Sequence, residues 1–220
     1  MAQKKSIYIG IIMNMSKFTK NKLAYHHKNL KESLVETAFE IVDKEGLKVL
    51  TLRELSIRLN ISRSAIYRHY DNKEALILDV MDKGYKQLNL VLAPILQDKT
   101  HSIAKRFEMM LGEYLNIAME QPNLYRLLFG NKYHKEYEKS HGHKDENHLM
   151  GLHPLISLLV DAQETEGIVL ENPMLQLTII WASVHGLALF LVDGNLLIKS
   201  NKEAINEYLK NVLLKVLKGL

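Results

Sequence analysis

Three helix-start signals stand close together between residues 51 and 72, and they divide this stretch into short helices. Thr51 and Glu54 form a capping box, in which the hydroxyl and the carboxylate would each satisfy a free backbone N–H. Asn60 tolerates the left-handed conformation that ends a helix, and Ser62 and Asn72 are N-caps for the helices that follow. The signals predict a helix over 51–60, a short helix over 62–69 and a longer helix over 72–96.

Apolar residues recur at helical spacing through much of the remaining chain. The first such repeat begins near Asn29 and ends at Gly46, which suits a left-handed C-cap. No stretch shows the alternation of a β-strand, and the 4 prolines leave long uninterrupted segments. We therefore expect an all-α fold of about nine helices. Later helices are expected over 102–119, after Pro122, and over 148–166, 173–194 and 201–218, whereas the polar segment 131–147 is expected to be a loop.

Composition excludes several kinds of protein. The sequence has no cysteine, which rules out disulfides, thiolate metal sites and cysteine nucleophiles. No run approaches the roughly 20 apolar residues of a membrane helix, so we expect no membrane span and a cytoplasmic location. Residues 1–24 are interpreted as a flexible extension.

Charge is distributed unevenly along the chain. Up to Lys73 there are 14 Lys and Arg against 7 Asp and Glu, whereas the remainder has 15 against 18. A basic N-terminal third ahead of a mildly acidic remainder favours a polyanion-binding module joined to a region with another task.

The two short helices joined by Leu59-Asn60-Ile61-Ser62 form a helix-turn-helix, whose second helix enters the DNA major groove. Ile66 and Tyr70 are four residues apart, so both are expected to face the protein. The outward side is then expected to carry Arg63, Ser64, Tyr67 and Arg68. The helix starts at Thr51, Ser62 and Asn72-Lys73 present N–H groups that attract phosphate.

Residues 25–78 resemble the DNA-binding domain of the TetR (tetracycline-repressor) family. The resemblance is carried by Leu30 to Phe39 with Gly46, Thr51-Leu52-Arg53-Glu54-Leu55, Ile61-Ser62, Ile66-Tyr67-Arg68-His69-Tyr70 and Asn72-Lys73-Glu74-Ala75-Leu76. The start Tyr25-His26-His27-Lys28-Asn29-Leu30 is typical of one branch, whose C-terminal Trp…His-Gly signature is matched by Trp181, His185 and Gly186. Asn60 stands where the family usually has glycine, and the family often has glycine or a small residue near Ser64-Ala65.

The resemblance and the helix starts together imply a role for each outward residue of the helix-turn-helix. The residues expected near base edges are Arg53, Arg63, Ser64, Ala65 and Arg68, of which Arg68 also suits a phosphate. The residues expected at phosphates are Thr51, Ser62, Tyr67, His69 and Lys73. Arg63 is the strongest candidate for reading guanine, because a guanidinium pairs with O6 and N7 together.

The resemblance also implies how the chain is organised. We expect residues 25–73 to bind DNA and residues 74–220 to form a helical regulatory domain, with a homodimer through helices 173–194 and 201–218. A small-molecule effector is expected in a pocket lined by Met109, Met110, Tyr114, Tyr125, Phe129, Trp181 and His185. The expected protein is a sequence-specific transcriptional repressor, released from a palindromic operator on duplex DNA by that effector. It has no expected catalytic role, cofactor or metal.

Two other interpretations stay open. Five histidines stand between His134 and His153, and His141-Gly142-His143 could chelate a metal ion, which would suit a metal-dependent enzyme or a metal sensor. The helical His-Glu-x-x-His motif of zinc proteases is missing from the sequence, however. The third interpretation is a DNA-packaging protein, which would show a steep salt dependence and no preference for palindromes.

Overall fold

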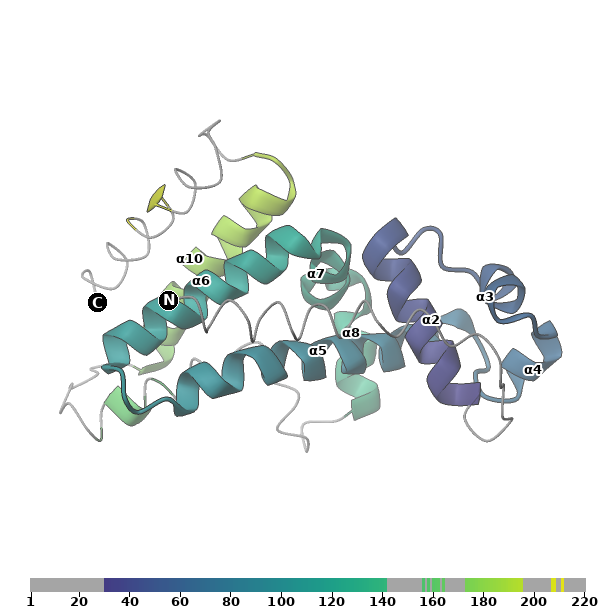
Figure 1. Ribbon diagram of the computed structural model, residues 1–220, viewed down its shortest axis with the longest axis horizontal. Coiled ribbons are helices and arrows are strands. Elements are labelled where there is room, and N and C mark those ends of the chain that lie inside the picture. Colours follow the sequence, from purple (N-terminus) through teal and green to yellow (C-terminus); the bar gives the residue numbers. More distant parts are fainter. Residues whose placement is uncertain are drawn as a thin grey trace. The chain divides into compact units, whose positions relative to one another are not determined.

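The structure is a computed structural model that describes residues 30–141 and 173–195, together with positions 156, 158, 160–162, 164, 207, 208 and 211. Every element within these residues is an α-helix, which confirms the all-α prediction. The helices are α2 (Leu30–Glu45), α3 (Leu52–Leu59), α4 (Arg63–Tyr67), α5 (Lys73–Gln97), α6 (Ile103–Glu120), α7 (Pro122–Phe129), α8 (Asn131–His141) and α10 (Pro173–Val192) (Figure 1). The single described positions beyond residue 155 that lie outside α10 and its C-terminal turn are helical too.

The chain divides into two compact units, Met1–Glu32 and Ser33–Leu220, and the interactions described below lie within the second unit. The predicted extension over residues 1–24 lies outside the described residues. Most of the predicted helices over 148–166 and 201–218 lies outside them as well. In the part of the chain that is described, no helix combines the length and the apolar character that crossing a membrane requires.

Residues in left-handed backbone end the first two helices, as predicted. Gly46 follows α2 with a φ of 89°, and its N–H donates to the carbonyls of Ile41 and Val42. Asn60 ends α3 with φ 52° and ψ 48°, a conformation that asparagine adopts more readily than most residues. These two ends turn the chain sharply, so α2, α3 and α4 stay separate short elements.

The longer helices build the main hydrophobic core. Helix α6 packs on α5, α7 and α10, and buried side chains from all four helices meet in one cluster. Its most buried members include Leu92, Leu115, Tyr125 and Ala188. At Gly84, α5 approaches α7 closely, because a Cβ atom there would lie 2.9 Å from Leu128 Cδ2.

Helix α8 corrects one prediction, because residues 131–141 are helical rather than part of a loop. Tyr133 and Tyr137 lie one turn apart and both are buried. The ring of Tyr137 packs against the ring of Tyr85 on α5, with the two centroids 5.2 Å apart. Two buried aromatic residues at this spacing give an otherwise polar segment the apolar side that a surface helix needs. Residues 142–147 lie outside the described residues.

Candidate nucleic-acid interface

Helix α4 is the second helix of the helix-turn-helix, and it is anchored on one side as predicted. The Ser62 hydroxyl caps it by accepting a hydrogen bond from the Ala65 N–H at 3.3 Å. Ile66 and Tyr70 are buried, and the Tyr70 hydroxyl donates to Asp79 on α5 at 2.7 Å. Burial and this contact with Asp79 raise the pKa of Tyr70. The hydroxyl therefore remains a donor that ties the end of α4 to α5.

The opposite side of α4 carries the residues that the sequence predicts to contact DNA. Tyr67 is 53% exposed. The other exposed residues on or next to this helix are Arg63, Ser64, Arg68 and His69, and Ala65 is half-buried. The Ser64 hydroxyl lies 2.8 Å from the Ser62 hydroxyl, at the start of the helix. The structure thus presents these residues to solvent, and their contacts with DNA stay predictions.

All three predicted N-caps of this region are confirmed. Besides Ser62, the Thr51 hydroxyl accepts from the Glu54 N–H at 3.0 Å, and Asn72 Oδ1 accepts from the Ala75 N–H at 2.8 Å. A capped helix start still has unpaired N–H groups that suit an anion. The phosphate contacts expected at Thr51 and Ser62 stay predictions.

Lys73 opens α5 and is half-buried. Its Nζ lies 3.4 Å from the carbonyl oxygen of Leu47, in the loop that follows α2. Burial and, to a smaller extent, the charge of Lys132 lower the pKa of Lys73. Lys73 is therefore partly held by the protein, and a phosphate would have to draw its side chain outward from Leu47.

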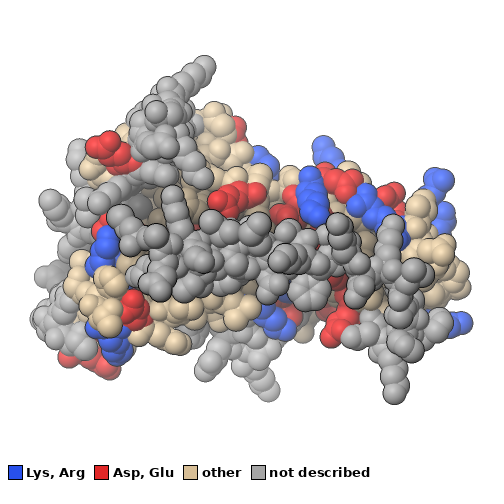
Figure 2. All heavy atoms as spheres, viewed as in Figure 1, with Lys and Arg blue, Asp and Glu red and all other residues tan. Residues whose placement is uncertain are grey.

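Three arginines of the helix-turn-helix are exposed to solvent. Arg53, Arg63 and Arg68 are exposed, and none of them makes an ion pair with another residue in the described ranges. In Figure 2, the charged atoms at the outer right-hand end of the molecule, where Figure 1 places α3 and α4, are blue. Unpaired guanidinium groups keep their full charge available to phosphates and guanine edges.

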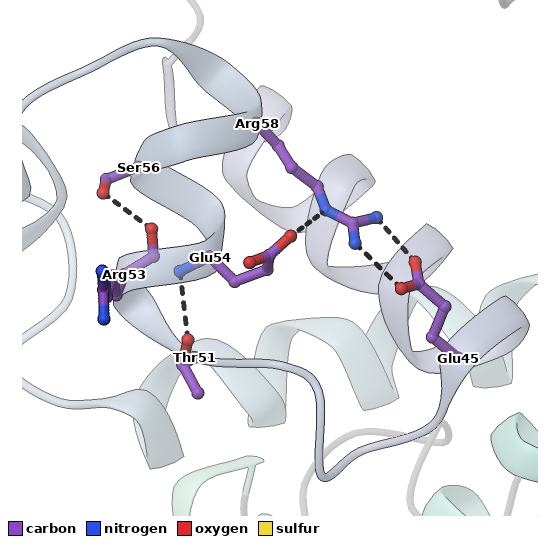
Figure 3. A network of polar contacts seen from close by, with 6 residues as sticks. All are labelled: Glu45, Thr51, Arg53, Glu54, Ser56 and Arg58. Atoms are coloured by element: carbon purple, nitrogen blue, oxygen red, sulfur yellow. Dashed lines mark hydrogen bonds and ion pairs between the residues drawn. The ribbon is translucent and has the colours of Figure 1, made fainter.

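Arg58, the fourth arginine of the helix-turn-helix, forms ion pairs with two glutamates of the protein (Figure 3). Its Nε donates to Glu54 at 2.7 Å, and its Nη1 and Nη2 donate to the two carboxylate oxygens of Glu45 at 2.7 and 2.9 Å. The Glu54 carboxylate is thus directed to Arg58, which corrects the prediction that it caps the start of α3. A charged guanidinium is a stronger partner than a neutral backbone N–H. The Thr51 half of the capping box is confirmed.

Arg58 was not among the residues predicted from the sequence, although one signal for it was present. Glu54 and Arg58 are four residues apart, a spacing that predicts an ion pair on a helix. Glu45 is 13 residues before Arg58 and lies on α2, so no local spacing points to it.

A second candidate site is an aromatic cluster in the main core, by which we mean Tyr85, Tyr114, Tyr125, Phe129, Trp181 and His185. Neighbouring rings in this cluster have centroids 4.9–6.1 Å apart. Trp181 and His185 stack at 5.6 Å with an interplanar angle of 11°. The cluster unites five residues of the predicted pocket and adds Tyr85. Met110 is buried in the same core, and Met109 packs against it.

Hydrogen bonds connect the polar atoms of the aromatic cluster. The Tyr114 hydroxyl donates to the Tyr125 hydroxyl at 3.1 Å, and the Tyr125 hydroxyl lies 2.7 Å from His185 Nδ1. Burial raises the pKa of Tyr125 to about 12 and lowers the pKa of His185 below its ordinary value of 6.5. Both tyrosines are therefore protonated and His185 is neutral at pH 7, so the cluster carries no charge.

One side of α10 is apolar and exposed. Leu175 and Phe190 are 55% and 54% exposed, and Ile179 and Leu189 are exposed as well. A Cβ atom built on Gly186 would meet no atom within 4 Å. An exposed side with several large apolar residues marks an interaction surface more often than a solvated one.

The histidine-bearing segment forms no metal site within the described residues. His134 lies on α8, where its Nε2 is 3.2 Å from Glu138. No three potential metal ligands come together anywhere in the described ranges. His143, His148 and His153 lie outside those ranges, as does the side chain of His141.

Comparison with protein families identifies both halves of the chain. Residues 34–80 match the family model for bacterial regulatory proteins of the tetR family. Residues 107–213 match the model for the tetracyclin repressor-like C-terminal domain. The two matches together span most of the chain.

Curated relatives match shorter segments. The chain is 35% identical to the class C tetracycline repressor protein of Escherichia coli over 63 residues, which are 29% of this chain and 28% of that protein. It is 27% identical to the nucleoid occlusion factor SlmA of Aliivibrio fischeri (strain MJ11) over 116 residues, which are 50% of this chain and 57% of that protein. The matched segments thus span less than two thirds of each relative's length.

Solved structures share the fold across nearly their whole length. A protein of unknown function from Rhodococcus sp. RHA1 has a TM-score of 0.70 at 21% identity, covering 90% of this chain and 99% of that chain. The transcriptional regulator FadR from Bacillus subtilis, in complex with stearoyl-CoA, has a TM-score of 0.66 at 12% identity. The match covers 86% of this chain and 98% of that chain. The branch suggested by Trp181, His185 and Gly186 stays a prediction. With family matches over residues 34–80 and 107–213 and the same all-helical architecture, this chain belongs to the tetR family of bacterial regulatory proteins.

Proposed function

We propose that this protein is a sequence-specific transcriptional regulator, a repressor that a small molecule releases from a palindromic operator, and that it has no catalytic role. The observation that carries the proposal is helix α4, which is anchored through Ile66 and Tyr70 and exposes Arg63, Tyr67 and Arg68 on its other side. A short helix with one buried and one polar side is what major-groove recognition requires. Residues 25–73 are the proposed DNA-binding domain and residues 74–220 the proposed regulatory domain.

The proposed DNA contacts divide into two sets. Base edges are read from Arg53, Arg63, Ser64, Ala65 and Arg68. Phosphates are bound at Thr51, Ser62, Tyr67, His69 and Lys73. Arg63 is the proposed reader of guanine, because its exposed guanidinium lacks a carboxylate partner among the described residues.

The proposed active form is a symmetric homodimer. The exposed apolar side of α10, with Leu175, Ile179 and Phe190, supports this assembly because a second copy would cover it. The last helix, predicted over 201–218, is the other proposed partner, and its described positions Glu207, Tyr208 and Asn211 are helical. A dimer of this kind places its recognition helices about 34–36 Å apart, in successive turns of the major groove.

The proposed effector site is the aromatic cluster. Its members carry no carboxylate, guanidinium or ammonium group, so an uncharged molecule with rings of its own is the proposed ligand class. Among the similar structures, FadR from Bacillus subtilis is in complex with stearoyl-CoA, and another neighbour, FrrA, is named a flavonoid-responsive regulator. An effector that prefers one conformation of the dimer weakens DNA binding by its difference in affinity for the two conformations. Repression in this form takes place on DNA in the cytoplasm.

Selection of bound duplexes from a random DNA pool tests this proposal. Purified protein is expected to enrich a palindrome, and Arg63→Ala is expected to relax the preference at one position in each half-site. A lost bidentate contact to guanine reduces discrimination by about 1–3 kcal/mol. Lys73→Ala is the control, and it should weaken all sequences about equally.

Two outcomes would contradict the proposal. Binding without any palindrome preference, combined with a steep salt dependence, would favour a DNA-packaging protein. A large rise in melting temperature with zinc, reversed by a chelator, would favour the metal-dependent alternative built on residues 134–153.

A further inference from the structure

The ion pair between Arg58 and Glu45 joins helices α2 and α3. Arg58 lies near the C-terminal end of α3, and Glu45 is the last residue of α2. Helix α3 packs closely on α4. The two parallel hydrogen bonds from Arg58 to Glu45 therefore supply a polar link between α2 and α3 (Figure 3).

Local helix preferences do not explain why Glu45 stands at this position. The C-terminal end of a helix carries a partial negative charge, so a carboxylate in the last turn of α2 is unfavourable on its own. The hydrogen bonds from Arg58, more than any other contact, lower the pKa of Glu45. A contact between helices thus compensates for the unfavourable placement of Glu45, which points to a role for the link itself.

The position of Arg58 on α3 decides what the link can control. Arg58 stands two residues before Asn60, whose left-handed backbone starts the turn into α4. Restraining this end of α3 restrains the direction in which the chain enters α4. The side chains that face DNA in the proposed function depend on that direction.

We propose that Arg58 is a positioning residue of the DNA-binding surface, which holds α3 on the end of α2 and does not itself contact DNA. This inference rests on the proposed function, because it assigns a role within DNA binding. It separates Arg58 from Arg53, Arg63 and Arg68, which have no carboxylate partner in the described ranges. Composition alone would count all four arginines as DNA contacts.

The expected effect on DNA binding is moderate. An exposed ion pair holds its two partners together only weakly, even with good geometry. Without the link, only a fraction of the molecules would hold α4 in the direction that DNA binding requires. The apparent Kd would then equal the Kd of those molecules divided by the fraction that they represent. We expect Arg58→Gln to raise Kd about fivefold for a duplex that the wild-type protein selects from a random pool.

The salt dependence separates positioning from direct contact. Losing one phosphate contact lowers the slope of log Kd against log salt concentration by about 0.9. A positioning residue changes this slope by much less than about 0.9, because salt then acts only by screening the exposed ion pair of Arg58 with Glu45. The Kd of Arg58→Gln should therefore stay several-fold above wild type across moderate salt concentrations. A slope that falls by about 0.9 would show that Arg58 binds a phosphate, and would overturn the inference.

Glu45→Gln gives a second and opposite test. Removing a negative charge near DNA should tighten binding if only charge matters. Because Glu45→Gln also breaks the link, we expect it to weaken binding by about threefold instead. The matched control is Glu40→Gln on the same helix, since the ion pair that Glu40 makes within the described ranges is with Lys44, on α2 itself. That variant should bind as tightly as wild type or slightly more tightly.

The charge-swapped double variant completes the test. Because Glu54 also contacts Arg58, the swap is made in a Glu54→Gln background, which leaves no second carboxylate facing position 58. There, Glu45→Arg with Arg58→Glu keeps the net charge and restores an ion pair between α2 and α3, so it should recover Kd to within about twofold of Glu54→Gln alone. Failure of this recovery, or an unchanged Kd in Arg58→Gln, overturns the inference alone. Thermal melting of each variant shows whether the protein is folded under the conditions of the binding assay. A wild-type protein that binds no duplex would overturn the proposed function, and this inference with it.

Discussion

The helices of the DNA-binding region and those of the main core are built in different ways. Helices α3 and α4 have 8 and 5 residues, whereas α5 and α6 have 25 and 18. The short helices bury few residues each, namely Leu55 in α3 and Ile66 in α4, while eight residues of α6 are buried. A side-chain cap of similar strength therefore supplies a larger share of the stability of a short helix that buries a single residue. The longer helices depend on packing.

The largest expected effect concerns packing in the main core. Leu115 on α6 is almost fully buried, so Leu115→Ala should lower the free energy of unfolding by about 2–5 kcal/mol in urea denaturation. Leu90→Ala is the matched control, because Leu90 lies on α5 and is 75% exposed, and it should change stability by less than about 0.5 kcal/mol. Equal losses in both variants would contradict the assignment of α6 to the centre of the core.

A pair of serine caps tests the difference between the two regions directly. Ser62 caps α4 and Ser102 caps α6, and each hydroxyl accepts a backbone hydrogen bond at 3.3 Å. Each serine-to-alanine change should cost about 1 kcal/mol of stability. Of the two variants, only Ser62→Ala should also weaken binding to a selected duplex, because α4 faces DNA in the proposed function and α6 does not. Weaker DNA binding in Ser102→Ala, measured well below its melting temperature, would show that the two regions are coupled.

The smallest expected effect is a pH dependence that arises in the aromatic cluster. Burial lowers the pKa of His185 in the folded protein below 6.5, so the unfolded chain takes up a proton at a higher pH than the folded chain. Stability should therefore fall as the pH drops below about 6.5, and stop falling once the folded protein is protonated too. His185→Gln should flatten this part of a melting-temperature profile. Identical profiles for both proteins would show that His185 does not contribute.

The helix boundaries of the helix-turn-helix could be predicted because they depend on residues that are close together in the sequence. The caps at Thr51, Ser62 and Asn72 and the left-handed turn at Asn60 each involve residues within four positions of one another, and all four predictions are confirmed. The link between Arg58 and Glu45 was not predictable in this way, because it depends on how α2 and α3 are placed in space.

Several residues of the main core could be predicted from the sequence, but the contacts between its helices could be predicted less well. Helical spacing and the family resemblance named Tyr125, Trp181 and His185, which lie together in the structure. Tyr85 was missed because its place beside α7 and α8 follows from packing, as its hydrogen bond to the Leu128 carbonyl at 2.6 Å shows. The helix at 131–141 was missed because its polar residues outnumber the two buried tyrosines that hold it in place.

The length of α4 sets how many base pairs one chain can recognise. With five residues, the helix brings only a few side chains to base edges, enough for about three or four base pairs. A sequence of four base pairs occurs by chance roughly once in every few hundred base pairs. A bacterial chromosome of about a million or more base pairs therefore contains thousands of chance matches. When the same sequence must be recognised twice at a fixed spacing, the probability of a chance match is roughly the square of its value for one copy. In the proposed homodimer, specificity is therefore set by the number of base pairs recognised, which the second copy increases and a higher affinity of one copy does not.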